Sequence, residues 1–197
     1  MGLFEFLGLK KNNNQTARTK ISNNAEQSKM YLSEVKSFIE NYPEIVAELK
    51  GCTDRQIIDL ENKLMVKLPS AYKEFLEWMG VKGGLLLRGS DVYYGYLIGS
   101  NWDSPEDSML KYAIELLDKN GFDGKTLLAN SIIIMMHQGY TIQFIKTNEG
   151  QNPPVYMFSE QGKWLEEGPS KWANSYSEHL LHTFKEEVKA WKKLGYI

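Results

Sequence analysis

The sequence predicts an α+β fold, with helices packed against an antiparallel sheet. Apolar residues recur at helical spacing in the first half of the chain, at strand spacing in the middle, and at helical spacing again near the C-terminus. The helical and strand segments therefore form separate blocks, whereas a parallel sheet would need them to alternate. The chain has 197 residues and no internal repeat, which suits one domain with an extension.

Composition narrows the kinds of partner and cellular setting. With 42% hydrophobic and 12% aromatic residues the chain can fill a core, and its formal net charge of −2 argues against a nucleic-acid partner. Cys52 is the single cysteine, so no intrachain disulfide can form. We expect a cytoplasmic protein in which Cys52 is inert. No segment has the apolar length of a transmembrane helix, and the first apolar run is too short for a secretory signal.

The chain divides into a flexible N-terminal head and linker, residues 1–25, and a single α+β domain, residues 26–197. The linker, from Lys10 to Asn24, is polar and has almost nothing to bury. The apolar head before it has two interpretations. It is either a weak amphipathic anchor or docking peptide, or a frayed terminus lying on its own domain.

Helical spacing opens the domain. Residues 26–49 are expected to form an amphipathic helix that Pro43 interrupts. Thr53 and Gln56 then form a capping box, which starts the next helix at residue 54. Ile57, Leu60 and Leu64 fall on one face of that helix, and Glu61 shares it.

A further helix follows directly. Pro69 suits its first position, where the missing N–H costs nothing. Its buried side is expected to carry Tyr72, Phe75, Leu76 and Met79, and Gly80 is expected to end it.

The middle of the chain switches to strand signals. Short strands are expected at residues 85–87 and 92–98, on either side of a turn. Ser104 and Pro105 then open a helix that ends at Asn120. Residues 127–136 are almost continuously apolar, as a strand buried on both faces would be. Further strands are expected at 140–145, at 155–158 and around 164–165.

A long amphipathic helix closes the chain. Ser175 and Glu178 form a capping box at its start, and apolar residues from Leu180 to Trp191 recur along one side up to Gly195. Lysines at 185, 189, 192 and 193 are interspersed with Glu178, Glu186 and Glu187. This mixture is typical of a solvated helix face.

The two helices around Pro69 carry a recognisable pattern. It consists of an apolar residue and a Glu, a Leu-Pro corner, a Tyr, a Phe-Leu pair and a Gly-bearing turn. The residues are Ile57, Glu61, Leu68, Pro69, Tyr72, Phe75, Leu76 and Gly80. With the later Pro154-Val155-Tyr156 and Ala173 to Tyr176, this pattern resembles the SUKH superfamily, named partly for yeast cell-wall assembly regulators of the Smi/Knr type. The resemblance spans roughly residues 51 to 188. The first fifty residues fall outside it, and the helix after Ser104 is longer than the family's core requires.

The resemblance implies an antiparallel sheet with packed helices, no catalytic machinery and no cofactor. Many bacterial members resemble immunity proteins that bind and block a cognate toxin, often a nuclease, and others act as regulators or adaptors. We therefore expect a non-enzymatic module that binds a protein partner, a cognate toxin domain. The alternatives are a regulatory or cell-wall-related adaptor, and a small-ligand-binding protein or enzyme.

The catalytic alternative depends on a few residues. Glu61 could act as a general acid, or its carboxylate could cap neighbouring N–H groups or pair with a base. His179 and His182 lie one helical turn apart and could reach one metal, but no further ligands accompany them, so we expect a solvated helix face and no metal site. No Gly-x-Ser-x-Gly elbow is present, and the glycines of residues 80–84 follow a helix, unlike those of a phosphate loop.

Aromatic and acidic residues after Gly80 are the candidates for partner binding, because Tyr and Trp anchor protein interfaces and carboxylates attract a basic partner. The carboxylates have an alternative role as complements to helix dipoles. The candidates are Tyr93, Tyr94, Tyr96, Trp102, Asp103, Glu106, Asp107, Trp164, Glu166 and Glu167.

Overall fold

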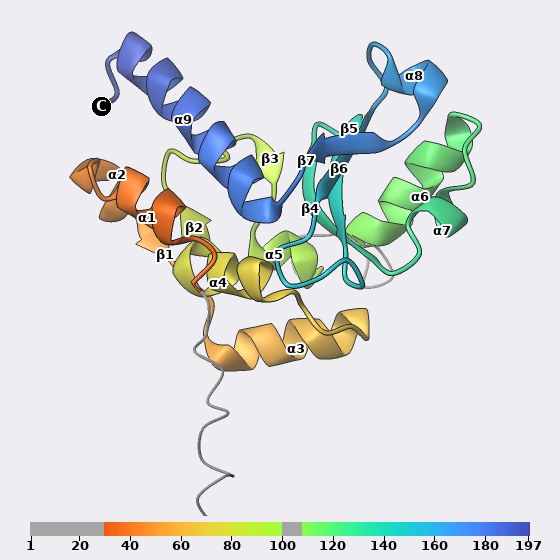
Figure 1. Cartoon of the computed structure of the whole chain (residues 1–197), viewed down its shortest axis with the longest axis horizontal. Helices are drawn as coiled ribbons and strands as arrows, with labels where there is room; N and C mark the ends of the chain where they lie inside the picture. Colours follow the sequence, from red (N-terminus) through yellow and green to blue (C-terminus); the bar gives the residue numbers. More distant parts are fainter. Residues whose placement is uncertain (1–29, 100–107) are drawn as a thin grey trace, which may run out of the picture.

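The computed structural model of the chain has the predicted α+β architecture, and it describes residues 30–99 and 108–197 (Figure 1). The helices in this part are α1 (Ser33–Ile39), α2 (Pro43–Val46), α3 (Asp54–Leu64), α4 (Ser70–Met79), α5 (Tyr94–Leu97), α6 (Met109–Lys119), α7 (Gly124–Leu127), α8 (Trp164–Glu167) and α9 (Tyr176–Leu194). The strands are β1 (Leu49–Lys50), β2 (Lys82–Gly83), β3 (Ser90–Asp91), β4 (Ser131–His137), β5 (Thr141–Lys146), β6 (Val155–Ser159) and β7 (Ser170–Ala173).

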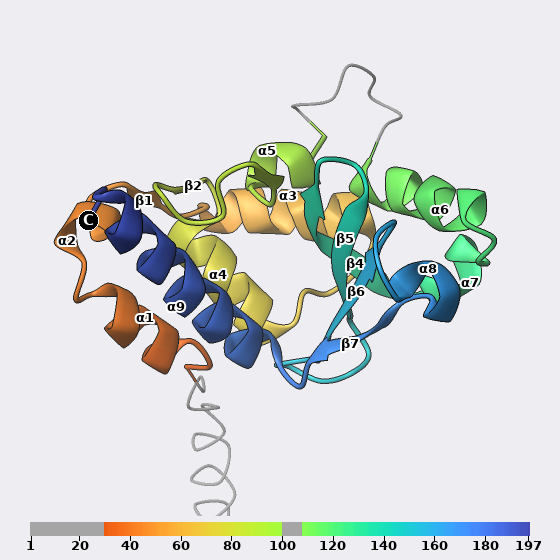
Figure 2. The same ribbon diagram turned by 90° about the horizontal axis from the view of Figure 1, so that it is seen from above.

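The main sheet is an antiparallel meander with the order β3-β4-β5-β6-β7, and β1 and β2 form a separate pair. Helices α6 and α7 lie on one side of this sheet, and α4 and α9 lie on the other (Figure 2). On the α6–α7 side, Phe122 meets Phe158 of β6 with ring centroids 5.6 Å apart. On the other side, Phe75 of α4 and Tyr176 of α9 meet edge to face at 5.9 Å.

The N-terminal helices extend the α9 side of the molecule. The predicted interruption at Pro43 is confirmed, since Pro43 is the first residue of α2. Glu74 of α4 holds α1 in place: one oxygen accepts the Leu32 N–H at 3.1 Å and the other pairs with Lys36 at 2.9 Å. Residues 26–29 of the expected helix lie outside the described residues.

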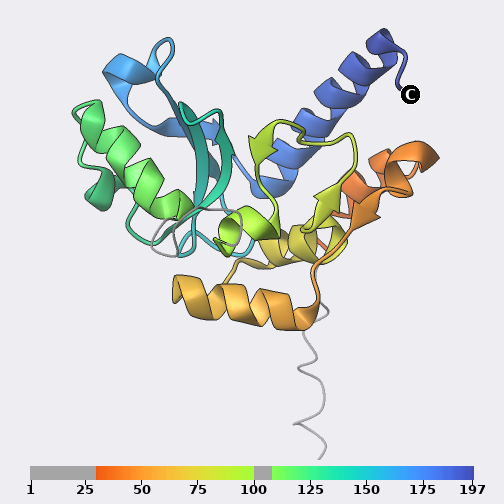
Figure 3. The ribbon, with the colours of Figure 1, turned by 180° about the vertical axis from the view of Figure 1, so that it is seen from behind.

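The segment from α3 to α4 forms as expected. Thr53 and Gln56 make both halves of the capping box, and Pro69 is the N-cap of α4 rather than its first residue. Tyr72, Phe75 and the other apolar residues of the stripe are buried. Helix α4 lies between α3 and α9 (Figure 3), so it is covered on both sides.

The prediction of strands at residues 85–87 and 92–98 is wrong. Residues 84–89 form turns, β3 has only two residues, and 94–97 is the short helix α5. Tertiary hydrogen bonds override the β-prone composition: the Tyr93 hydroxyl donates to the Leu86 carbonyl at 2.7 Å, and the Tyr94 N–H donates to the Gly80 carbonyl at 2.8 Å.

Three other boundaries also differ. Helix α6 begins at Met109, after Ser108, whose backbone is extended and whose hydroxyl accepts the Lys111 N–H. The expected start at Ser104 and Pro105 lies outside the described residues. Residues 124–127 form α7, capped by Asp123, and the buried strand starts only at Ser131. Residues 164–167 form α8, and the strand comes later, at 170–173.

The remaining elements follow the predictions closely. Strands β5 and β6 match the expected ranges within one residue. Helix α9 is capped at its start by Ser175, whose hydroxyl accepts the Glu178 N–H at 3.2 Å, and at its end by Gly195, which has a left-handed conformation. Within residues 30–99 and 108–197, no helix combines the length and apolar character needed to cross a membrane.

Candidate partner-binding site

Glu61 has a structural environment at the corner between α3 and α4. Its side chain is only about 7% exposed. One oxygen accepts the Leu68 N–H at 3.0 Å, and the other pairs with Lys67 at 2.7 Å. Burial alone would raise the pKa of Glu61, but the bonds from Lys67 and Leu68, together with the charge of Lys73, lower it below its ordinary value. The carboxylate thus caps a backbone N–H and pairs with bases, as the structural interpretation expected.

Two other residues of the SUKH-like pattern, Tyr72 and Phe75 of α4, contact Tyr176 at the start of α9. Tyr72 and Phe75 stack on each other with centroids 6.0 Å apart, and Tyr176 meets Tyr72 edge to face at 5.4 Å. Leu76 is completely buried. Burial also raises the pKa of the Cys52 thiol to about 11, so the thiol is protonated at neutral pH and unreactive. This part of the molecule is scaffold.

Glu187 of α9 is a structural anchor that the sequence interpretation missed. Both of its oxygens accept the Leu87 N–H, at 3.0 and 3.1 Å, and Leu87 has a left-handed backbone with φ of 54°. Burial raises the pKa of Glu187 to about 7. The expectation that Glu187 belongs to a solvated face is therefore wrong. Its spacing of three residues from the buried Phe184 was the available signal.

The two histidines of α9 differ. His182 is exposed, as expected, but His179 is only 5% exposed and lies beside Tyr176. The solvated face predicted for His179 is wrong, because Tyr176, His179 and Leu180 share the buried side of α9. Burial, with a smaller contribution from His182, lowers the pKa of His179 to about 4. In the described part of the chain, no group of three or more His, Cys, Asp or Glu residues is placed to hold a metal.

The candidate tyrosines are incorporated into the fold around α5. Tyr93, Tyr94 and Tyr96 are each half-buried. Burial first, and then the charge of Glu187, raise the pKa of Tyr93, whose hydroxyl is bound to the Leu86 carbonyl. Burial likewise raises the pKa of Asp91, against a hydrogen bond from Tyr96. These hydroxyls stabilise the turns before α5. The neighbouring candidates Trp102, Asp103, Glu106 and Asp107 lie outside the described residues.

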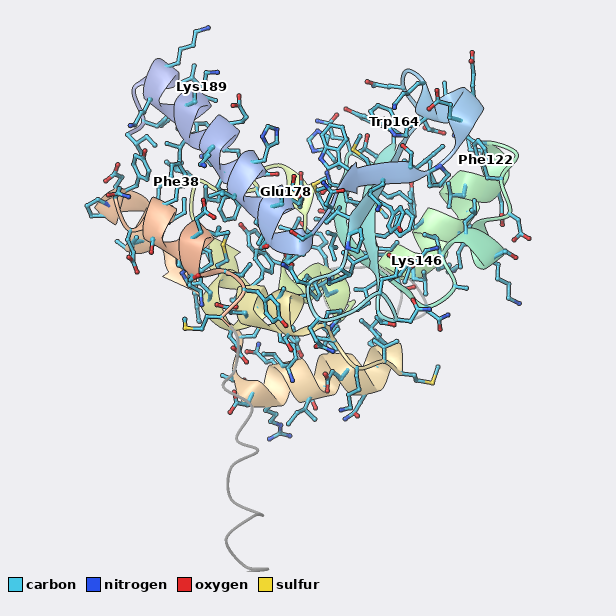
Figure 4. The ribbon with its side chains drawn as sticks, viewed as in Figure 1. Phe38, Phe122, Lys146, Trp164, Glu178 and Lys189 are labelled. Atoms are coloured by element: carbon cyan, nitrogen blue, oxygen red, sulfur yellow. The ribbon has the colours of Figure 1, made fainter. Side chains whose placement is uncertain are left out.

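The other candidates lie on what we call the α8–β7 surface, formed by Trp164, Leu165, Glu166, Glu167 and Trp172. Trp172 is 47% exposed and Leu165 is 43% exposed. Trp164 is half-buried beneath them: its ring nitrogen donates to the Ser170 hydroxyl at 3.1 Å, and its ring centroid lies 6.1 Å from that of Trp172. Figure 4 shows Trp164 on the sheet side of the molecule and Lys189 on the α9 side.

The exposure of Trp172 has a local cause. Val155 of β6 pairs with Ala173, but the next residue, Tyr156, pairs with Lys171, so Trp172 is the extra residue of a β-bulge. Strand β7 is also an edge strand. The bulge turns two successive side chains, Lys171 and Trp172, toward solvent. Sequence reasoning missed Trp172 because no pattern in the sequence marks a bulge.

A cavity lies away from the α8–β7 surface, between α1, α2 and α4. It has a volume of about 390 Å³ and is lined by Lys36, Ile39, Glu40, Val46, Glu77 and Trp78. Lys36 is already paired with Glu74, and the lining supplies no Ser, Cys or His as nucleophile or base.

A comparison with known families bears on the part of the fold from α3 to the start of α9. No curated protein matches the chain. The family model described as "SMI1 / KNR4 family (SUKH-1)" matches residues 51–181, which is more than half of the chain. This stretch runs from the residue before Cys52 into α9 and includes every residue of the pattern around Pro69. The chain therefore belongs to the SMI1/KNR4 family (SUKH-1).

Proposed function

We propose that this chain is a non-enzymatic protein-binding module, an immunity protein that binds and neutralises a cognate bacterial toxin domain. Family membership supports this class of function. The bonds of Glu61 to the Leu68 N–H and to Lys67 also support the proposal, because the catalytic alternative needed Glu61 as its general acid. A regulatory adaptor is the second candidate, and it would use the same kind of surface.

The observation that carries the proposal is the exposed Trp172 on the α8–β7 surface. An indole held against a second, half-buried indole is a rigid apolar anchor, and Trp is the residue type most enriched among interface hot spots. Leu165 extends the apolar area, and the exposed carboxylates of Glu166 and Glu167 lie beside it. Lys163 lies 3.8 Å from Glu167, which leaves Glu166 to attract a basic partner.

The test is to co-express the chain with the toxin-like domains encoded beside its gene, and to measure both protection of the cells and affinity. Trp172→Ala is expected to weaken the complex by roughly thirtyfold, because truncating a central Trp removes about 2 kcal/mol or more. The matched control is Ile58→Ala, an exposed apolar residue on α3 (55% exposed), which is expected to leave affinity unchanged.

Two results would count against the proposal in different ways. If none of the neighbouring domains is neutralised or co-purified, the immunity function fails. If a complex forms but Trp172→Ala binds as tightly as Ile58→Ala, the module binds through another surface.

A further inference from the structure

Two buried polar side chains line one small cavity at the junction of α9 and the sheet. They are His179 of α9, 5% exposed, and Gln143 of β5, 7% exposed. Within the described chain, His179 Nδ1 and Gln143 Oε1 are buried and have no hydrogen-bond partner. The other polar atom of Gln143, Nε2, contacts only the weak acceptor Met157 Sδ, at 3.8 Å. Unpaired buried polar atoms destabilise a fold, so both atoms need a partner.

The size of the cavity limits what that partner can be. The room for the centre of a water-sized sphere is about 10 Å³, close to the minimum of roughly 10–15 Å³ that one water needs. The rest of the wall includes the apolar side chains of Phe75, Leu87, Ile134 and Leu180. Nothing larger than a water molecule fits, and an ion would lack compensating charge.

The chemistry of the two atoms is matched. Gln143 Oε1 is an acceptor only. Because burial lowers the pKa of His179 to about 4, its imidazole is neutral at physiological pH, and with the proton on Nε2 its Nδ1 is also an acceptor. Two acceptors cannot bond to each other, but each can accept one O–H of the same water.

We propose that this cavity binds a single ordered water, which donates one O–H to His179 Nδ1 and the other to Gln143 Oε1. The water would join α9 to the central strand β5, two elements that lie in different layers of the fold (Figure 2). Leu87 forms part of the wall, and its N–H is held by Glu187 from the same helix. Helix α9 therefore supplies His179, which binds the water, and Glu187, which holds the Leu87 part of the cavity wall in place.

A double-mutant cycle tests the bridge. Gln143→Leu and His179→Phe each leave the buried water with one acceptor instead of two, and each is expected to lower the folding equilibrium constant roughly tenfold or more. The double variant removes both acceptors and the need for water, so its loss is expected to be smaller than the product of the single losses. His182→Phe, at an exposed position of the same helix, is the control and is expected to cause no loss. Multiplicative losses in the double variant would overturn the proposal.

A measurement on the wild-type chain is independent of whether the variants fold. Nitrogen NMR of the imidazoles is expected to report His179 as the neutral tautomer with an unprotonated, hydrogen-bonded Nδ1, and magnetisation is expected to transfer from a long-lived water to the Gln143 side-chain amide. A protonated Nδ1 bonded directly to Gln143, or the absence of any long-lived water there, would refute the bridge.

Discussion

At the scale of single residues, the most informative groups are two ionisable side chains of α9, the buried His179 and the half-buried Glu187, whose pKa values shift in opposite senses. The pKa of Glu187 is raised to about 7 and the pKa of His179 is lowered to about 4. In both cases the cause is burial, which disfavours the charged form. In the folded state Glu187 stays protonated up to about pH 7, whereas His179 stays neutral down to about pH 4. Between pH 4.5 and 6.5 their effects on stability oppose each other.

Replacing Glu187 separates the two effects. As pH rises from the unfolded pKa, 4.5, to the folded pKa, about 7, the folded state binds more protons than the unfolded state, so Glu187 lowers stability progressively. Relative to Glu187→Gln, the wild type is expected to lose up to about 3 kcal/mol of unfolding free energy between pH 4.5 and 7.5. Urea unfolding at several pH values measures it.

Glu186→Gln is the matched control, because Glu186 is the adjacent, exposed carboxylate. Its pH profile is expected to follow the wild type. A Glu187→Gln profile parallel to the wild type over this range would show that Glu187 titrates normally.

At the scale of elements, the close packing of the end of α4 explains Gly80. The backbone of Gly80 is helical, with φ of −65°, so its conformation does not require glycine. The requirement is steric: an added Cβ would lie 2.6 Å from the Leu76 carbonyl oxygen and 2.8 Å from Cys52 Sγ. The segment before α3 therefore lies directly against the last turn of α4.

Gly80→Ala is expected to destabilise the fold by about 1–3 kcal/mol through overpacking, although alanine favours helices. Glu77→Ala, at an exposed position of the same helix, is the control, and its midpoint in denaturant should match the wild type. A Gly80→Ala variant as stable as the Glu77→Ala variant would mean that the contact between the end of α4 and Cys52 adjusts to the extra methyl group without loss of stability.

At the scale of the whole molecule, one connected core runs from the N-terminal helices to the sheet. It includes Leu32 and Ile39 of the first helical segment, Phe75 of α4, Phe184 of α9, and Phe158 of β6. Because these residues form one contiguous cluster, the folded part is expected to unfold in a single cooperative transition. Far-ultraviolet circular dichroism and tryptophan fluorescence should give the same midpoint in urea. Two separated midpoints would show that residues 26–197 contain more than one cooperative folding unit.

The longer helices α3, α4 and α9 were predictable because their signals are local. The Thr53 and Ser175 caps and the apolar stripe of α4 depend on residues within one or two turns. The Thr53 box and the stripe formed as expected, and Ser175 makes the hydroxyl half of its expected box. The strands of residues 85–98 failed for the opposite reason. Their composition favours strands, but Tyr93 and Tyr94 find hydrogen-bond partners in turns and at the end of α4.

The candidate site was predictable only in part. Trp164, Glu166 and Glu167 lie together on the α8–β7 surface, but the tyrosines near α5 are bound into the fold, and the role of Trp172 depends on a bulge in β7. A bulge arises from the pairing of two strands, so the residues of either strand alone do not reveal it.

The sequence by itself determined the α+β class and the capped helices around the Leu68-Pro69 corner, since spacing and caps are encoded over a few residues. The tertiary structure alone decided which residues of α9 are buried and which side chains of β7 are exposed. Glu187 meets Leu87 across a hundred positions of the chain, and His179 meets the cavity beside Gln143 across two layers of the fold. The burial of a polar group is a property of the packed molecule, because it depends on everything that covers the group.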